Sequence, residues 1–192
     1  MMSPKPRLED SVADILARAP ARFVLVGTSY GGNLAMEVAL AAPGRVTALC
    51  LMGCNPAAPQ PGGPDLAAGL EATPDAVIDR LAGLVVHREA VAAAAAFKSM
   101  AQRVGGAAAA AQARALGVRR EATTRLVSLT MPALVLWGEE DALVPVAEGR
   151  ALAAALPHAR FEVLKGCGHL PTLEQPAACA ARFRTLLDAA PK

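Results

Sequence analysis

The sequence predicts an α/β fold, in which a mostly parallel sheet of about four strands is flanked by helices. Four apolar runs of strand length alternate along the chain with stretches of helical periodicity. The second run is apolar nearly throughout, as expected for a strand covered by helices on both faces. The four runs are residues 22–27, 45–53, 133–138 and 160–164.

Helical periodicity is found on both sides of these runs. The predicted helices are residues 8–18, 31–41, 146–156 and 173–187. Strands that are separated in sequence by helices form parallel sheets with right-handed crossovers. The order of elements therefore predicts a parallel sheet.

The length of 192 residues and the apolar fraction of 54% predict one domain spanning residues 1–192. Neither a repeat nor a linker divides it. A helical insertion is expected at residues 55–125, between the second and third strands. It opens with a loop rich in Pro and Gly and continues as an alanine-rich stretch that predicts about three helices.

The charge balance gives no reason to expect a nucleic acid or a membrane as partner. Nineteen Lys and Arg against 17 Asp and Glu leave a net charge of +2. The chain has no apolar run long enough to span a membrane, and its first residues lead into no signal-peptide core. The four cysteines form no CxxC pair, so we expect reduced thiols and a cytoplasmic location. The spacing of Cys54, Cys167 and His169 is not that of a structural zinc site, so no metal is expected.

The first motif with chemical meaning is Gly27-Thr28-Ser29-Tyr30-Gly31, which lies between a predicted strand and a predicted helix. This G-x-S-x-G arrangement is the nucleophile elbow, in which a sharp turn lifts the serine hydroxyl clear of the main chain. Ser29 is therefore expected on strained backbone. The alternatives are a serine in an ordinary glycine-rich turn or a phosphate-binding loop, but the lysine of a Walker loop and a G-x-G-x-x-G pattern are both absent.

An acid and a histidine follow the third and fourth strands. Asp141 lies in the segment GEEDALVP and His169 in the segment GCGHLP. Sites in open α/β sheets form at the carboxyl edge of the strands, where Ser29 is also expected. Asp141 alone would be a loop-capping residue, and His169 alone a buried core histidine. Their order after Ser29, however, is that of a Ser-Asp-His hydrolase.

From about residue 8 to its end, the chain resembles an α/β-hydrolase of the small esterase, lactonase and C–C-bond-hydrolase kind. The resemblance rests on the GTSYGG elbow, the GEEDALVP segment and GCGHLPTLEQP around the histidine. It implies Ser29, Asp141 and His169 as catalytic residues, and the helical insertion as a cap that roofs the substrate pocket. Glu174 and Pro176 also match the family pattern, where they help to start the final helix.

The resemblance implies acyl transfer to water on a small carboxylic ester or lactone, without metal or organic cofactor. The backbone N–H of Tyr30 would supply one donor of the oxyanion hole. Met52 and Leu143 are candidates for the pocket lining. A C–C-bond hydrolase or perhydrolase using the same residues and a truncated non-catalytic homologue are the alternatives. The sequence of the insertion does not indicate the substrate.

The resemblance also exposes a departure from the family. The family sheet carries four more strands before the elbow strand, and a loop after one of them supplies the second oxyanion N–H. This chain has room there for one helix. We therefore expect the elbow strand to have a bare edge, where a second copy could pair to form a homodimer. Loss of one oxyanion donor would lower turnover by roughly 10²–10³.

Overall fold

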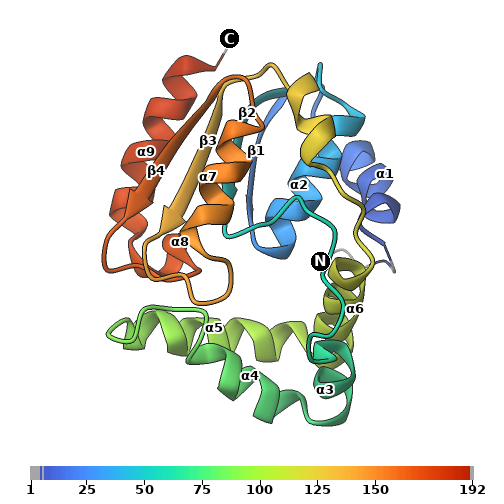
Figure 1. The fold of residues 1–192 in the computed structure, drawn as a ribbon, viewed down its shortest axis with the longest axis vertical. Helices are drawn as coiled ribbons and strands as arrows, with labels where there is room; N and C mark the ends of the chain where they lie inside the picture. Colours follow the sequence, from blue (N-terminus) through green and yellow to red (C-terminus); the bar gives the residue numbers. More distant parts are fainter. Residues whose placement is uncertain (1–4, 6, 191–192) are drawn as a thin grey trace.

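The computed structural model describes residues 5 and 7–190, and its centre is one parallel four-stranded sheet (Figure 1). The strands lie in chain order: β1 (Phe23–Thr28), β2 (Val46–Met52), β3 (Ala133–Gly138) and β4 (Ala159–Leu164). The predicted parallel sheet of four strands flanked by helices is confirmed. Each strand begins and ends within one residue of its expected position.

Helices cover both faces of the sheet. On one face, α2 (Tyr30–Ala41) packs against β1 and β2, and α7 (Val146–Ala154) packs against β3 and β4. Helix α1 (Leu8–Arg18) packs on α2 rather than on the sheet. The other face is covered by α9 (Pro176–Ala189), which runs along the sheet in Figure 1.

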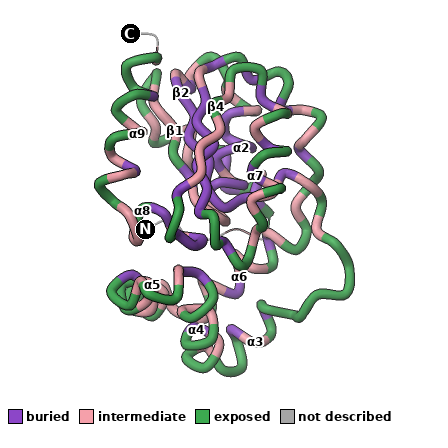
Figure 2. The backbone as a smooth tube through the Cα atoms, turned by 60° about the vertical axis from the view of Figure 1, so that its left-hand side comes forward, coloured by how far each residue is buried: buried purple, intermediate pink, exposed green. Residues whose placement is uncertain are grey.

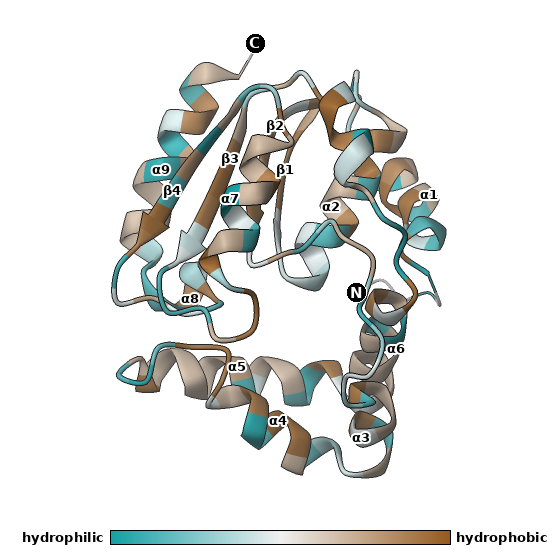
Figure 3. Ribbon diagram, viewed as in Figure 1, coloured by the Kyte–Doolittle hydropathy of each residue, from teal (hydrophilic) through white to brown (hydrophobic). Residues whose placement is uncertain are grey.

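Two apolar clusters, one on each face, make up most of the core. The cluster under α2 and α7 contains the fully buried Trp137, whose Nε1 donates a hydrogen bond to the carbonyl of Val144 at 2.8 Å. The cluster under α9 includes Cys50, Leu136 and Cys179. Burial is concentrated in the two central strands, β2 and β3, which are also hydrophobic along their length (Figures 2 and 3). The burial of β2 and β3 on both faces explains their continuous apolar sequences.

The insertion between β2 and β3 holds more helices than its sequence predicted. Its α-helices are α3 (Leu66–Ala72), α4 (Pro74–Ala82), α5 (Val91–Val104) and α6 (Gly106–Gly117), and a short 3₁₀ helix (Thr123–Ser128) leads back to β3. About three helices were expected. The boundary between α3 and α4 lies at Thr73, because the residue before a proline is disfavoured in helical conformation. In Figure 1 helices α3 to α6 lie beyond the carboxyl ends of the strands.

The final helix was predicted to be continuous over residues 173–187, and this was wrong. A short helix, α8 (Pro171–Glu174), ends before α9 begins at Pro176. Gln175 between them is not helical, with φ −135° and ψ 62°. Pro176 explains the break, since its ring excludes the helical conformation for the preceding residue.

Strand β1 lies at one edge of the sheet. Among the described residues it pairs with β2 alone. Its other edge is therefore bare in the part of the chain that the structure describes, as the sequence predicted. The side chain of Val26 near its end is 47% exposed. An unpaired and partly apolar edge of this kind is a template for pairing with another strand.

Candidate active site

Ser29 lies on the sharp turn between β1 and α2. Its φ of 55° and ψ of −120° make it the one described non-glycine residue with a positive φ. The expected strained backbone at this serine is therefore confirmed. Its N–H donates to the carbonyl of Met52 at 2.9 Å, which fixes the turn to the end of β2. Its own carbonyl accepts hydrogen bonds from the N–H groups of Gly32 and Asn33 at the start of α2.

The turn is so tight that Gly27 and Gly32 have no room for a side chain, whereas Gly31, the last glycine of the G-x-S-x-G motif, has open space beside it. A Cβ on Gly27 would lie 2.3 Å from the carbonyl oxygen of Gly31. A Cβ on Gly32 would lie 2.7 Å from the Sγ of Cys54. The strand and the helix therefore nearly touch at Gly27, as the elbow motif predicts, but the space beside Gly31 does not itself require a glycine.

Asp141 and His169 are brought together at the carboxyl edge of the sheet. Asp141 Oδ2 lies 2.8 Å from His169 Nδ1, and the two side chains are only 1% and 3% exposed. The other carboxylate oxygen, Oδ1, accepts the backbone N–H groups of Leu143 and Val144, each at 2.9 Å. Because both oxygens have defined partners, the carboxylate is held in one orientation. Donation from Nδ1 to Oδ2 leaves the lone pair of a neutral imidazole on Nε2.

The imidazole lies beside the elbow. A Cβ on Gly53 would be 2.8 Å from His169 Cε1, so the ring rests against the main chain of that glycine. Gly53 directly follows Met52, whose carbonyl holds the N–H of Ser29. His169 Nε2 is buried without a hydrogen-bond partner among the described residues. The structure thus shows no hydrogen bond between Ser29 and His169. In enzymes without bound substrate, catalytic hydrogen bonds are often long and shorten only when substrate binds.

Two glutamates support the loop of His169, and sequence reasoning missed this role for both. Glu140, to which the sequence analysis assigned no role, accepts the N–H groups of Gly166 and Cys167 at 3.2 and 2.9 Å. Glu174, expected to help start the final helix, instead accepts N–H groups on either side of His169. No pattern in the sequence indicated these contacts, because they depend on the path of the loop.

The remaining predicted site residues lie in three different settings. Tyr30 is the first residue of α2, so its N–H has no intrahelical acceptor and is directed outward at the helix N-terminus. Met52 is 1% exposed and belongs to the buried cluster under α9. Leu143, in the loop of Asp141, is 41% exposed. The pocket-lining roles of Met52 and Leu143 stay predictions.

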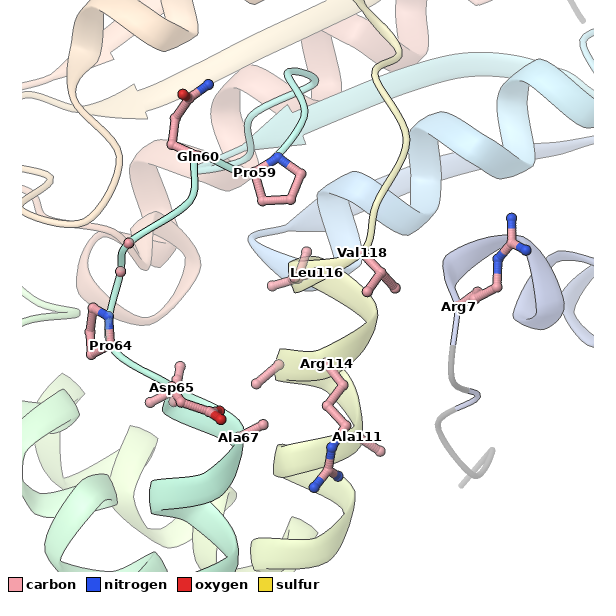
Figure 4. Close-up of a pocket in the computed structure, with 15 residues that line it drawn as sticks. Arg7, Pro59, Gln60, Pro64, Asp65, Ala67, Ala111, Arg114, Leu116 and Val118 are labelled. Atoms are coloured by element: carbon pink, nitrogen blue, oxygen red, sulfur yellow. The ribbon is translucent and has the colours of Figure 1, made fainter.

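A separate hollow of about 800 Å³ lies between the loop that enters the insertion and helix α6 (Figure 4). Its lining is mainly apolar, and Ser29, Asp141 and His169 do not contribute to it. Its charged residues have partners: Arg7 pairs with Glu9, Arg114 pairs with Glu71, and Asp65 caps α3. The hollow is thus distinct from the candidate active site.

The four cysteines are free and buried. Burial raises the pKa of the Cys54 thiol to about 12, and it also raises the pKa values of the other three. Such thiols are poor nucleophiles at neutral pH. Within residues 5 and 7–190, no cluster of three or more His, Cys, Asp or Glu side chains is arranged to hold a metal ion. Over the same residues, no helix has the length and apolarity to cross a membrane.

Comparison with known sequences places the chain among hydrolases. A sequence model of the alpha/beta hydrolase family matches residues 5–182. A pimeloyl-[acyl-carrier protein] methyl ester esterase of Aromatoleum aromaticum is 33% identical over 199 aligned positions, covering 91% of this chain and 78% of the esterase. A 2-hydroxy-6-oxononadienedioate/2-hydroxy-6-oxononatrienedioate hydrolase of Dechloromonas aromatica is 29% identical, covering 76% of this chain and 55% of that enzyme.

Solved structures share the fold. A thermophilic esterase from Thermogutta terrifontis superimposes with a TM-score of 0.85 at 22% identity, covering 98% of this chain and 74% of the esterase. The enol-lactonase from Burkholderia xenovorans gives a TM-score of 0.85 at 20% identity, covering 98% of this chain and 75% of the lactonase. The chain therefore spans about three-quarters of the length of these two proteins.

Proposed function

Since this chain belongs to the alpha/beta hydrolase family, we propose that it is a serine hydrolase that cleaves a small carboxylic ester or lactone. Ser29 is the nucleophile, His169 the general base and Asp141 the acid that orients it. The product of the first half-reaction is an acyl-enzyme on Ser29.

The observation that supports this proposal most strongly is the buried Asp141–His169 pair beside the elbow. The 2.8 Å contact at Nδ1 gives the imidazole its tautomer and leaves Nε2 free to accept a proton. The ring lies against Gly53, one residue beyond the carbonyl that holds the Ser29 N–H. A structural histidine would instead be expected to have both ring nitrogens satisfied when buried.

The chemistry follows from these positions. Ser29 Oγ attacks the carbonyl carbon of the ester while its proton passes to His169 Nε2, and the carbonyl oxygen becomes an oxyanion. The Tyr30 N–H donates to this oxyanion, aided by the positive end of the α2 dipole. As the C–O bond breaks, the imidazolium returns the proton to the leaving alcohol. Water then repeats the cycle on the acyl-enzyme and releases the acid.

We favour ester cleavage over C–C bond cleavage because the esterase relative matches more of this chain, at higher identity, than the C–C-bond hydrolase relative does. In both reactions the same serine and histidine would act. Tyr30 supplies the one oxyanion donor that we assign.

A fluorophosphonate probe tests the nucleophile. The wild-type protein should be labelled at Ser29, and labelling should disappear in Ser29→Ala. The control is His158→Ala, at an exposed histidine that precedes β4, at the opposite end of that strand from the His169 loop, and it should be labelled normally. Hydrolysis of p-nitrophenyl acetate and γ-butyrolactone then distinguishes ester from lactone preference. A folded wild-type protein that takes no label would contradict the proposal and support the non-catalytic homologue.

The free edge of β1 supports a second proposal, that two copies associate through it. The edge has no partner among the described residues, and Val26 near its end is 47% exposed. A Val26→Lys variant should sediment as a monomer where the wild type sediments as a dimer, because a charged edge opposes strand pairing. A monomeric wild type would contradict it.

We also propose a cytoplasmic location, on the ground that the four cysteines are free.

A further inference from the structure

The helical insertion is seated directly on the loop that carries His169. The segment between α4 and α5 supplies the contact. The backbone N–H of His169 donates to the carbonyl of Val85 at 3.1 Å. A Cβ on Gly168 would lie only 2.7 Å from the backbone nitrogen of His87, so the two chains touch main chain to main chain.

One side chain joins these two segments. Glu174 Oε2 accepts the N–H of His87 and the N–H of Gly168, both at 2.7 Å. Glu174 Oε1 accepts the N–H of Leu170 at 3.0 Å. Two of the three donors flank His169, and the third belongs to the insertion. Hydrogen bonds to a carboxylate are roughly twice as strong as those between neutral groups, so this is a firm connection.

The surroundings hold this carboxylate in place. Glu174 is the last residue of α8, which follows His169 within the same loop. An apolar cluster of Val85, Val86 and Ala93 from the insertion packs against Leu170 and Leu173 on either side of Pro171. Glu140, by contrast, binds only N–H groups of the histidine loop and none from the insertion.

We propose that Glu174 is a positioning residue that couples the seating of the insertion to the placement of the His169 imidazole. This inference rests on the proposed hydrolase function. When the insertion is seated, Glu174 and the Val85 carbonyl fix the main chain on both sides of His169. If the insertion lifts, Glu174 loses the N–H of His87 and the N–H of His169 loses the Val85 carbonyl, so the histidine loop is no longer fixed and the imidazole leaves its position beside Asp141.

Glu174→Gln tests the coupling, because it keeps the shape of the side chain but replaces one acceptor oxygen by an NH₂ group. A misplacement of about 1 Å can cost on the order of 10²-fold in rate, so we expect a fall of roughly tenfold in the rate of fluorophosphonate labelling per folded molecule. With an ester substrate, kcat should fall by a similar factor while KM changes less than about threefold. A merely structural role would lower the folded fraction and leave the rate per folded molecule unchanged.

The insertion side is tested through the backbone N–H of His87. His87→Pro removes that donor, and His87→Ala, the matched control, keeps it. We expect His87→Pro to slow labelling roughly as Glu174→Gln does, and His87→Ala to label within about twofold of wild type. The double variant should be no slower than either single variant, since both remove the same connection. Additive losses would overturn the coupling.

Hydrogen exchange gives a readout that does not need activity. Glu174→Gln should lower the protection of the amides of His87, Gly168 and Leu170 together by at least about tenfold. Glu140→Gln should lower that of Gly166 and Cys167 and leave the amide of His87 protected. An unchanged His87 amide in Glu174→Gln overturns the inference. If the wild type takes no label but these amides respond together, the proposed function fails while the connection stands.

Discussion

Gly53 offers the sharpest test of how the imidazole is placed. The residue has a φ of +54°, and a Cβ added to it would lie 2.8 Å from His169 Cε1 and 2.9 Å from Nδ1. Ordinary contacts of a Cβ begin at 3.4 Å, so in Gly53→Ala the ring must withdraw by about 0.6 Å. A misplacement of about 1 Å can cost on the order of 10²-fold in rate. The rate of fluorophosphonate labelling at Ser29 should therefore fall roughly tenfold.

The same substitution also has a backbone cost. An L-residue in the left-handed region is disfavoured by about 1–2 kcal/mol, which corresponds to a fall in Tm of roughly 2–8 °C for a chain of this length. Gly166→Ala is the matched control, because Gly166 has a φ of +65° and its Cβ would meet nothing nearer than 4.0 Å. It should lower Tm by a similar amount and leave the labelling rate within about twofold. If Gly53→Ala labels as fast as wild type, or if Gly166→Ala slows labelling equally, the steric reasoning is refuted.

Three further predictions follow from the site and the core. Asp141→Asn should slow labelling by on the order of 10³-fold or more at little cost in Tm, because an amide at Oδ2 no longer holds the required tautomer, and a loss below tenfold would contradict its assigned role. Gly27→Ala should lower the free energy of unfolding in urea by more than about 3 kcal/mol, because its Cβ would lie 2.3 Å from the backbone oxygen of Gly31, which is held in α2. An unchanged urea midpoint would show that the turn can open. The cysteines should resist Ellman's reagent at pH 8.5 until denaturant is added. Burial raises the pKa of Cys54 to about 12, whereas the thiol of an unfolded chain ionises at about 8.5. Below a pH of about 8.5 this thiol should therefore not affect the free energy of unfolding, and as the pH rises from there toward 12 that free energy should fall, as measured by urea unfolding at each pH.

The elements of the sheet could be predicted because their signals are local. A buried parallel strand must be apolar on both faces, so β2 and β3 were visible as continuous runs between Gly and Pro. The elbow was visible for a similar reason. The close approach of β1 and α2 allows only glycine at Gly27, and this leaves a glycine at a fixed spacing before Ser29.

The helix boundaries in the insertion and before α9 were less accurate. Alanine is the best helix former, so long alanine-rich stretches give no contrast from which to place a boundary. The breaks at Thr73 and Gln175 depend on the proline that follows each of them. The conformational restriction on the residue before proline was available in the sequence, and applying it would have divided the final helix correctly.

The sequence alone determined the order of strands and helices, the family resemblance and the identity of the three residues proposed for catalysis, because each depends on residue types at short spacing. Only the tertiary structure decided what lies around them. It placed Oδ2 of Asp141 2.8 Å from Nδ1 of His169, the ring against Gly53, and the carboxylate of Glu174 between the insertion and the histidine loop. These contacts join residues up to 87 positions apart, as His87 and Glu174 are, and most of them involve backbone groups. Backbone groups are the same in every residue, so no pattern of side chains along the chain could reveal them.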